Sequence, residues 1–445
     1  MNLNELAQNI EASYQIDQQL YTDFNVKRGL RNKDGSGVLV GLTRIGGVTG
    51  YVKEEEEIIP VEGKLRYRGI EISDIVNTIS KENRNGFEEI AFLLLFGKLP
   101  NETELNSFKA IIDDNLDLPA GFKENMILKA PSSDIMNKLA RSVLALYSYD
   151  DNPDSIDLLN VLRQSIELIA RFPAMIAYGF QAKSHYYDHK SLYLHNPVKG
   201  IGLAENFLRM IRPNKKYTEL EARTLDISLI LHAEHGGGNN SAFTTHVVTS
   251  SDTDTYSAIS AAIGSLKGPK HGGANNKVMG MMEYIKQNVK NWEDTKEVSD
   301  YIVKILRKQV YDNKGLVYGI GHAVYTISDP RAIILKKYAY ELAKSTGNEK
   351  EFVLYDLVEK VTPKLFHEIK DNSKVVSANV DFYSGFVYNM LCLPPELYTP
   401  IFAMARISGW CAHRIEEIFA GGRIIRPAYK NLGNKAEYIP LKDRK

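Results

Sequence analysis

"YTELEARTLDISLILHAEHGGG", residues 217–238, is the stretch that most clearly indicates the fold class. Thr218 followed three residues later by Glu221 is the pattern of a capping box, in which each side chain binds a free backbone N–H at the start of a helix. Leucine and isoleucine residues form one face of the helix that follows, and Gly236 is placed to end it. The stretch therefore predicts an amphipathic helix.

The same periodicity recurs along most of the chain. Residues 86–100 form an apolar helix that stops at a glycine and a proline, and residues 394–422 repeat apolar side chains at helical spacing until Gly421 and Gly422. Residues 35–70 differ, because glycine and β-branched residues there predict short strands and turns, with Glu54 to Glu57 in a solvated turn. No sustained strand–helix alternation is present. The pattern predicts an all-α protein with short β segments near the N-terminus.

The overall composition excludes several classes of protein. Lys+Arg and Asp+Glu number 55 each, so the net charge is zero, and we expect neither a nucleic-acid nor a membrane-surface partner. The two cysteines, Cys392 and Cys411, are too few for a disulfide framework. The N-terminal twenty residues have no basic-then-apolar pattern, and the longest apolar runs are too short to span a membrane. We expect a cytoplasmic protein.

Histidines next to glycines are the most unusual local feature. His271 lies in "LKGPKHGGAN" (266–275) and His322 follows two glycines. Glycine lets the backbone approach a ligand closely, and functional side chains favour such loops. We do not expect zinc at His232 and His235, because the H-E-x-x-H spacing is absent and no cysteine lies near.

The other glycine-rich motifs lack the sequence elements that normally accompany them. "HGGG" at 235–238 matches an oxyanion-hole motif of esterases, but the chain has no G-x-S-x-G elbow. The G-x-x-x-x-G-K-[ST] phosphate loop is absent, and Gly319 and Gly321 lack the third glycine of a dinucleotide fingerprint.

One carboxylate and three arginines complete the candidates. Asp381 lies at or just before the start of an aromatic-rich helix. Two roles are open to it there, the N-cap of that helix and a general base. Surrounding rings would raise its pKa by desolvation while a helix N-terminus would lower it, which suits a general base. Arg331, Arg406 and Arg426 lie beside Pro or Gly or within an apolar helix, where a fixed arginine can clamp a carboxylate.

Seven motifs together resemble the citrate synthase family. Three of them are "SLKGPKHGGAN" (265–275), "GIGHAVYTISDPR" (319–331) and "NVDFYSG" (379–385), and the matches run from about Gly29 to Tyr429. The resemblance implies that His271 binds the thioester carbonyl of acetyl-CoA, His322 polarises the keto oxygen of oxaloacetate, and Asp381 removes the methyl proton. No metal and no cofactor is implied, since coenzyme A is a substrate and product carrier.

The resemblance also implies the remaining ligands and the assembly. His235, Arg331 and Arg406 match the family's ligands for the carboxylates of oxaloacetate and citrate. Arg426 matches an arginine that reaches into the neighbouring subunit's site, so a homodimer is expected. The small helical domain would be an insertion at 276–377, between the large-domain segments 1–275 and 378–445, and its closure would exclude water after oxaloacetate binds.

The chemistry explains why one histidine sits in a tight bend. A thioester α-proton is weakly acidic, so the developing enolate needs a hydrogen-bond donor already aimed at its oxygen. We expect Gly268 and Pro269 to place His271 near a helix that begins around Ala274. The positive end of that helix would keep the imidazole neutral. Gly272 and Gly273 would leave room for the thioester.

Some questions stay open at this stage. Many family members have an arginine near Thr326 that holds a CoA phosphate, so Lys267, Lys270 or another lysine would take that role here. One alternative activity is 2-methylcitrate synthase, which uses propionyl-CoA, because one methylene discriminates only modestly. A second alternative is a non-catalytic sensor of acyl-CoA or dicarboxylates, although a sensor has no need for Asp381.

Overall fold

The computed structural model describes residues 2–54, 57–370 and 375–444, which divide into two compact units, 1–44 and 45–445. The first unit holds α1 (Leu3–Tyr14), α2 (Gln18–Asp23) and one turn of 3₁₀-helix, Arg28–Leu30. Asn2 caps α1 by accepting from the backbone N–H of Glu5, whose side chain accepts from the Asn2 N–H.

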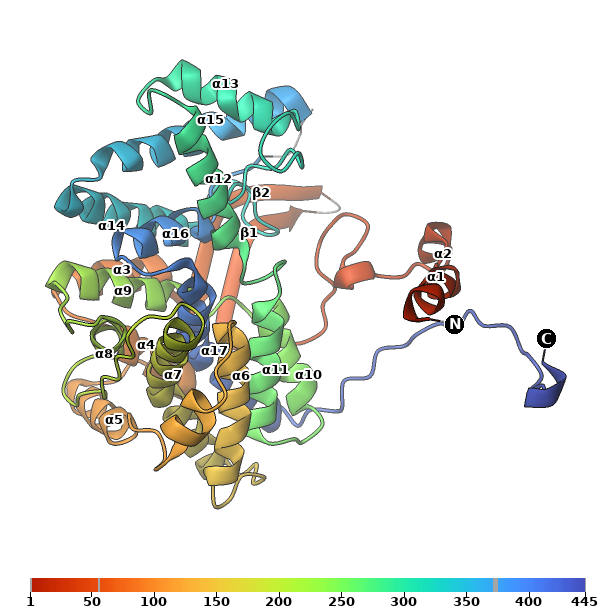
Figure 1. The fold of residues 1–445 in the computed structure, drawn as a ribbon, viewed down its shortest axis with the longest axis horizontal. Coiled ribbons are helices and arrows are strands. Elements are labelled where there is room, and N and C mark those ends of the chain that lie inside the picture. Colours follow the sequence, from red (N-terminus) through yellow and green to blue (C-terminus); the bar gives the residue numbers. More distant parts are fainter. Residues whose placement is uncertain (1, 55–56, 371–374, 445) are drawn as a thin grey trace. The chain divides into compact units, whose positions relative to one another are not determined.

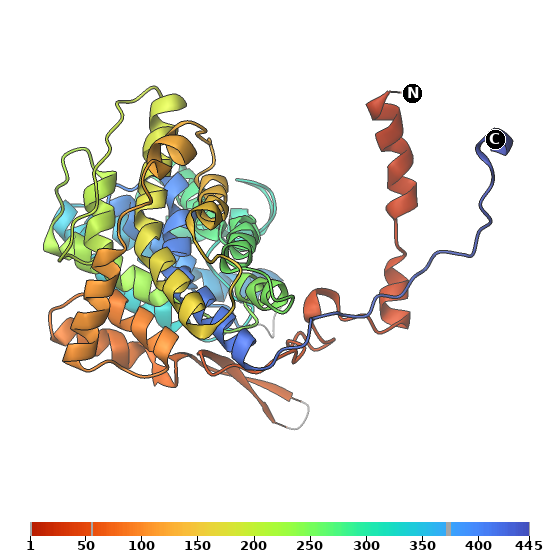
Figure 2. The same ribbon diagram turned by 90° about the horizontal axis from the view of Figure 1, so that it is seen from below.

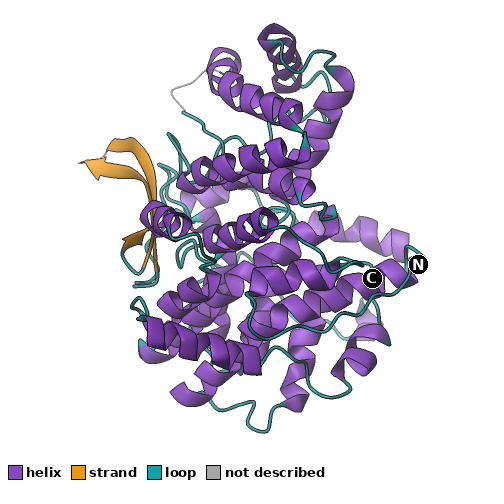
Figure 3. Ribbon diagram, turned by 90° about the vertical axis from the view of Figure 1, so that its left-hand side faces the viewer, coloured by secondary structure: helices purple, strands orange, loops and turns teal. Residues whose placement is uncertain are grey.

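The second unit begins with a small antiparallel sheet. Strand β1 (Gly46–Glu54) pairs with β2 (Glu57–Tyr67), which pairs with the two-residue β3 (Ile70–Glu71). Figure 3 shows these strands at one edge of the helices. The predicted β character of residues 35–70 is thus confirmed from Gly46 onward, whereas Glu55 and Glu56 of the predicted turn lie outside the described residues.

Nearly all of the regular secondary structure in the remainder is helical, which confirms the all-α class (Figure 3). The α-helices are α3 (Ile72–Lys81), α4 (Phe87–Phe96), α5 (Glu102–Asp114), α6 (Ile135–Leu146), α7 (Leu158–Tyr186), α8 (Leu203–Ile211), α9 (Glu219–His232), α10 (Asn240–Thr249), α11 (Thr255–Lys267), α12 (Ala274–Asn288), α13 (Thr295–Leu306), α14 (Pro330–Thr346), α15 (Glu349–Lys370), α16 (Val380–Met390) and α17 (Tyr398–Phe419). A π-helical turn (Lys123–Leu128) and short 3₁₀ turns (Tyr147–Tyr149, Pro395–Leu397 and Leu441–Asp443) join them.

Helix α9 begins as predicted and ends earlier than predicted. Thr218 and Glu221 form the capping box. The helix ends at His232, not at Gly236, and the Tyr67 side chain binds its last turn. The Tyr67 hydroxyl donates to the carbonyl of Ile230 over 2.9 Å, a carbonyl that also accepts from the Ala233 N–H, and the same hydroxyl oxygen accepts from the Glu234 N–H. Residues 233–239 become a loop instead.

Helix α17 forms the centre of the helical packing. Every residue from Tyr398 to Arg414 is buried, because α17 packs against α4, α6, α7, α9, α10 and α11 (Figure 1). An almost wholly buried helix places its few polar side chains where water does not reach them. Arg406, His413 and Arg414 are such side chains.

A second group of helices carries the predicted small domain. Helix α13 packs on α15, α14 on α15 and α16, and α12 on α16. Figure 1 shows α12 to α15 together at the top. The predicted segment 276–377 contains most of α12 and all of α13 to α15. Its division from 1–275 and 378–445 as a separate domain stays a prediction.

Beyond α17, residues 420–440 run without helix or strand and are mostly exposed (Figure 2). Across the described ranges, none of the helices combines the length and the apolar character that crossing a membrane requires.

Candidate active site

The bend around His271 forms as the sequence predicts. The N–H of His271 donates to the Gly268 carbonyl and that of Gly272 to the Leu266 carbonyl, both over 2.9 Å, and α12 begins at Ala274. The predicted reason for Gly272, room for a thioester, is not what the structure shows there. A Cβ on Gly272 would collide with the Leu266 carbonyl and the Thr399 side chain, so packing within the chain requires this glycine.

His271 is held by a hydroxyl and kept neutral. Its Nε2 lies 3.1 Å from Oγ of Ser241, and Trp410 Nε1 donates to the same Oγ over 3.0 Å. Burial, followed by the charge of Arg406, lowers the pKa of His271 to about 4. The sequence analysis relied on the start of α12 for this effect, but desolvation is the larger cause.

The ring of His322 has a defined tautomer. Its Nδ1 accepts from the backbone N–H of Val324 over 3.0 Å and of Tyr325 over 3.1 Å. A neutral imidazole with an accepting Nδ1 carries its proton on Nε2, which is therefore a donor. Tyr325 stacks on the ring with centroids 4.8 Å apart.

The β-hairpin supports the loop that carries His322. A Cβ on Gly50 would collide with the Val324 carbonyl, and one on Gly63 with the Ser328 carbonyl. The Gly63 N–H also donates to Ser328 Oγ over 3.1 Å. Two glycines thus let strands β1 and β2 lie directly against this loop.

His235 follows Glu234 in the loop after α9. The His235 ring centroid lies 5.4 Å from that of His322 and 5.5 Å from that of Tyr325. Burial and the charge of Arg331 hold the pKa of His235 well below its usual value, and its Nε2 is buried without a hydrogen-bond partner among the described residues. A buried polar atom of this kind is expected to receive a ligand.

Asp329 links Arg331 to the start of the helix that carries Asp381. The Asp329 carboxylate accepts from Nε (3.0 Å) and a terminal nitrogen (2.7 Å) of Arg331, and from the Val380 N–H (3.2 Å) at the start of α16. Asn379, not Asp381, caps α16. Burial raises the pKa of Asp381 to about 6, against the opposing charges of Arg331 and Arg406.

Arg406 differs from Arg331 in having no carboxylate partner. Its Nε donates to the His232 carbonyl over 2.7 Å, and both terminal nitrogens are buried without a partner among the described residues. Burial lowers its pKa to about 10. Two buried guanidinium nitrogens of this kind are the arrangement that a carboxylate ligand would complete.

Six of the seven predicted site residues come together. His235 interacts electrostatically with Arg331, His322 and Arg406, and Asp381 and His271 each interact with Arg406. Arg426 is exposed beyond α17, and the contacts described for the chain do not join it to the other six.

The residues weighed for other roles lie as follows. Thr326 Oγ1 donates to the Gly50 carbonyl over 3.5 Å, Lys267 pairs with Asp134 at 3.3 Å, and Lys270 is exposed. His232 Nδ1 lies 2.7 Å from the Ser228 carbonyl oxygen inside α9.

Sequence reasoning missed several residues of the site. Asp329 had a usable signal, since an Asp before Pro at a helix start is a capping pattern. Ser241 and Trp410 had none, because their contacts depend on helices that meet only in the folded chain, whereas Tyr325 lies three residues after His322 in the same loop.

Comparison with known proteins decides the family. A family model described as "Citrate synthase, C-terminal domain" matches residues 35–428, which is most of the chain. The chain belongs to the citrate synthase family. It is therefore an enzyme of acyl transfer, in agreement with the resemblance of its motifs.

Citrate synthase relatives cover the chain almost entirely. Citrate synthase of Synechocystis sp. is 32% identical over 90% of this chain and 93% of its own length. 2-Methylcitrate synthase 1 of Corynebacterium glutamicum is 30% identical over 95% of this chain and 100% of its own length. Citrate synthase of Thermoplasma acidophilum, solved as a ternary complex with carboxymethyl coenzyme A and oxaloacetate, has a TM-score of 0.76 at 26% identity, covering 94% of this chain and 99% of that one.

Proposed function

We propose that this chain is a citrate synthase, which condenses acetyl-CoA with oxaloacetate and water to give citrate and CoA. The observation that carries the proposal is Arg406, whose two terminal nitrogens, like the Nε2 of the interacting His235, are buried without a hydrogen-bond partner among the described residues. A carboxylate of oxaloacetate would satisfy all three donors. Arg331, fixed by Asp329, would support the second carboxylate.

The first chemical step would be removal of a methyl proton from acetyl-CoA. Asp381, with a pKa raised to about 6, accepts that proton at neutral pH more readily than an ordinary carboxylate. Ser241 Oγ lies 3.1 Å from His271 Nε2 and donates its own proton to Asn239 Oδ1 over 3.0 Å, so this hydroxyl holds the ring in position. His271 would donate a ring N–H to the thioester oxygen. The neutral ring stabilises the enolate oxygen without giving up a full proton.

The second step would form the carbon–carbon bond. The enolate carbon attacks the keto carbon of oxaloacetate, and the keto oxygen takes the proton that His322 carries on Nε2. Water then cleaves the thioester, so that the acyl carbon becomes a carboxylate and CoA leaves as the thiol. No electron carrier is needed in this balance.

We propose that the CoA moiety binds next to the loop that carries His322. A pocket lined by residues 316–321 together with Thr362 and Phe366 adjoins His322 and offers apolar walls and backbone groups. Lys270 is exposed and suits a phosphate better than Lys267, which is paired with Asp134.

The assembly is part of the same proposal. We propose a cytoplasmic homodimer in which Arg426 completes the neighbouring site, since it is exposed and no contact given for the described residues joins it to its own site. Mixing an Arg426→Gln chain with an Asp381→Asn chain should restore part of the activity in the mixed dimers. Failure to restore activity in a verified mixed dimer would contradict this role.

The preference for acetyl-CoA or propionyl-CoA has to be measured, because citrate synthase and 2-methylcitrate synthase relatives are about equally similar to this chain. The test is release of free CoA, followed with a thiol reagent, from acetyl-CoA and propionyl-CoA in parallel with oxaloacetate. Faster release from acetyl-CoA supports citrate synthase, and faster release from propionyl-CoA moves the assignment to 2-methylcitrate synthase.

The same experiment separates enzyme from sensor. Asp381→Asn keeps the shape of the site and should lose about 10³-fold or more in kcat with oxaloacetate binding retained. No release from either thioester by the unmodified chain would contradict the proposed catalysis. Family membership already speaks against a non-catalytic sensor.

The order of binding can be tested independently. We propose that oxaloacetate binds first and closes the 276–377 segment over the site. Stopped-flow binding of acetyl-CoA should therefore strengthen when oxaloacetate is present. Equal binding with and without oxaloacetate would contradict this order.

A further inference from the structure

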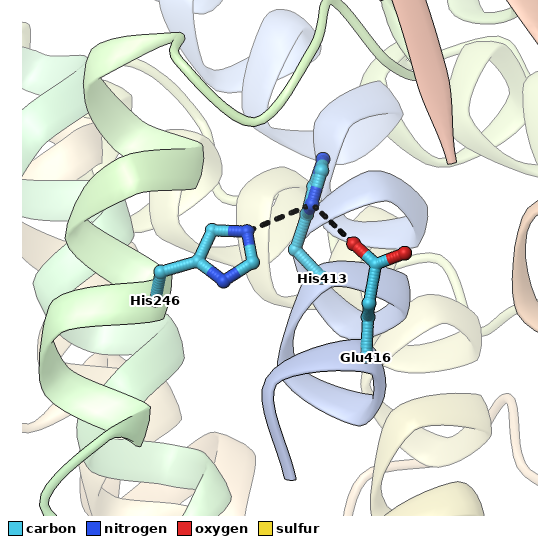
Figure 4. Close-up of side chains that lie close together, drawn as sticks. All are labelled: His246, His413 and Glu416. Carbon is cyan, nitrogen blue, oxygen red and sulfur yellow. Dashed lines mark hydrogen bonds and ion pairs between the residues drawn. The ribbon is translucent and has the colours of Figure 1, made fainter. Parts of the chain in front are cut away.

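Three potential metal ligands meet beside the loop that carries His235, outside the proposed catalytic machinery. His246 extends from α10, and His413 and Glu416 extend from α17 (Figure 4). His246 Nε2 lies 3.0 Å from His413 Nδ1, and Glu416 Oε2 lies 3.9 Å from the same Nδ1. One ligand atom from each residue lies within 4.8 Å of the others.

The outer nitrogens of both rings face carboxylates. His246 Nδ1 lies 2.7 Å from Glu417 Oε2, and His413 Nε2 lies 3.0 Å from Glu234 Oε1. Ionised carboxylates only accept hydrogen bonds, so each outer nitrogen is the one that carries a proton. The two inner nitrogens, 3.0 Å apart, then either share a proton in a hydrogen bond or bind one cation together.

This arrangement is the one found around metal-bound histidines. A ligating imidazole usually donates its other N–H to a carboxylate, which fixes the ring and raises its basicity. Tetrahedral zinc–nitrogen bonds of about 2.0–2.1 Å place two ligand nitrogens about 3.3 Å apart. The observed 3.0 Å between the inner nitrogens needs only a small adjustment.

The surroundings provide space and negative charge. A Cβ on Gly237 would stand 3.5 Å from His246 Nε2 and 3.8 Å from His413 Nδ1, so the missing side chain leaves room beside both nitrogens. Three carboxylates, those of Glu234, Glu416 and Glu417, border the two rings. Such a border favours a cation over a neutral ligand.

We propose that His246, His413 and Glu416 bind a divalent transition-metal cation of the zinc type, with Glu417 and Glu234 holding the two rings. Glu234 also accepts from the Gly236 N–H, so the ion would be linked to the loop of His235. The sequence analysis tested only His232 and His235 for zinc. The proposed ligands were missed because positions 246 and 413 are 167 residues apart.

The test is metal binding by the intact chain after chelator treatment, titrated with Zn²⁺ and with Co²⁺. We expect one tight ion per chain and, with Co²⁺, the visible absorption bands of a four- or five-coordinate site. His246→Arg replaces the bound ion with a fixed cation that still pairs with Glu417, so it should lose binding more than tenfold while circular dichroism and Tm stay near those of the unmodified chain.

A matched control distinguishes this site from other histidines. His367 is exposed on α15, and His367→Gln should leave the affinity unchanged. Failure of the unmodified chain to bind Zn²⁺ or Co²⁺ at micromolar free metal would overturn the proposal and leave the two rings sharing a proton. Binding that persists in His246→Arg would overturn it as well, because the ion would then occupy another place.

Discussion

Two buried arginines in this enzyme have opposite surroundings. Arg331, at the start of α14, forms two hydrogen bonds with Asp329, and its pKa is raised because this charge outweighs burial. Arg406, inside α17, binds one carbonyl and leaves two nitrogens without a partner among the described residues, and its pKa falls to about 10. The first arginine is complete within the chain, whereas the second is complete only with a ligand. Burial alone therefore does not distinguish the two, whereas buried guanidinium nitrogens without a hydrogen-bond partner among the described residues mark Arg406 as the one that a ligand completes.

The largest expected effect comes from removing the incomplete arginine. Arg406→Gln should lower kcat/KM about 10³-fold or more, because the substrate carboxylate loses its charged partner in a water-free site. Steady-state kinetics with varied oxaloacetate would measure this. A loss below tenfold would mean that Arg406 does not bind the substrate.

The same substitution at the two arginines should separate their effects on stability. Arg331→Gln leaves the buried carboxylate of Asp329 without its charged partner and should lower the free energy of unfolding by about 3–5 kcal/mol. Arg406→Gln removes a buried charge that no carboxylate hydrogen-bonds within the described residues, so it should change the free energy of unfolding by less than about 1 kcal/mol, or raise it. Urea unfolding of both variants checks this, and equal losses would remove the distinction.

A ligand should complete Arg406 and stabilise the fold. Oxaloacetate or citrate at about 100 times its Kd should stabilise the chain by about 2.7 kcal/mol. Thermal unfolding would show a higher Tm with ligand. The Arg406→Gln variant should show almost no ligand-dependent rise, whereas the exposed Lys270→Gln variant should respond to citrate like the unmodified chain.

The smallest expected effect concerns pH, through the carboxylate that both arginines face. Burial raises the pKa of Asp381 to about 6, and the base must be ionised to accept a proton. The rate constant kcat/KM should therefore be constant above about pH 7 and fall tenfold per unit below about pH 6. Arg406→Gln removes one charge that lowers this pKa, so the fall should begin at a higher pH. A profile without this shift would show that Arg406 and Asp381 do not interact.

The sequence could predict the helices because local patterns determine them. The capping box of Thr218 and Glu221, the strands after Gly46 and the bend before His271 all depend on residues close in the chain. The early end of α9 was missed because Tyr67, whose hydroxyl binds the Ile230 carbonyl in the last turn, is 163 residues from Ile230 in the sequence. Long-range contacts of this kind carry no local signal.

The candidate site was predicted by motif and not by its contacts. The motifs named six residues that the fold brings together, but they gave no indication that Asp329 joins Arg331 to α16 or that Ser241 binds His271. The reasons given for the neutral His271 and for Gly272 were also incomplete. Burial and packing, which depend on the folded chain, are the larger causes.

The contact between the hairpin and the loop of His322 has a consequence for synthesis of the chain. Gly63 and Ser328 are 265 residues apart in the sequence, yet the Gly63 N–H donates a hydrogen bond to Ser328 Oγ. At about 5–20 residues per second, a ribosome needs roughly 15–50 s to pass from one to the other. For that time strand β2 has emerged without the loop that covers it. The newborn chain therefore exposes an uncovered strand, which chaperones or early helices have to protect until the loop of His322 is made.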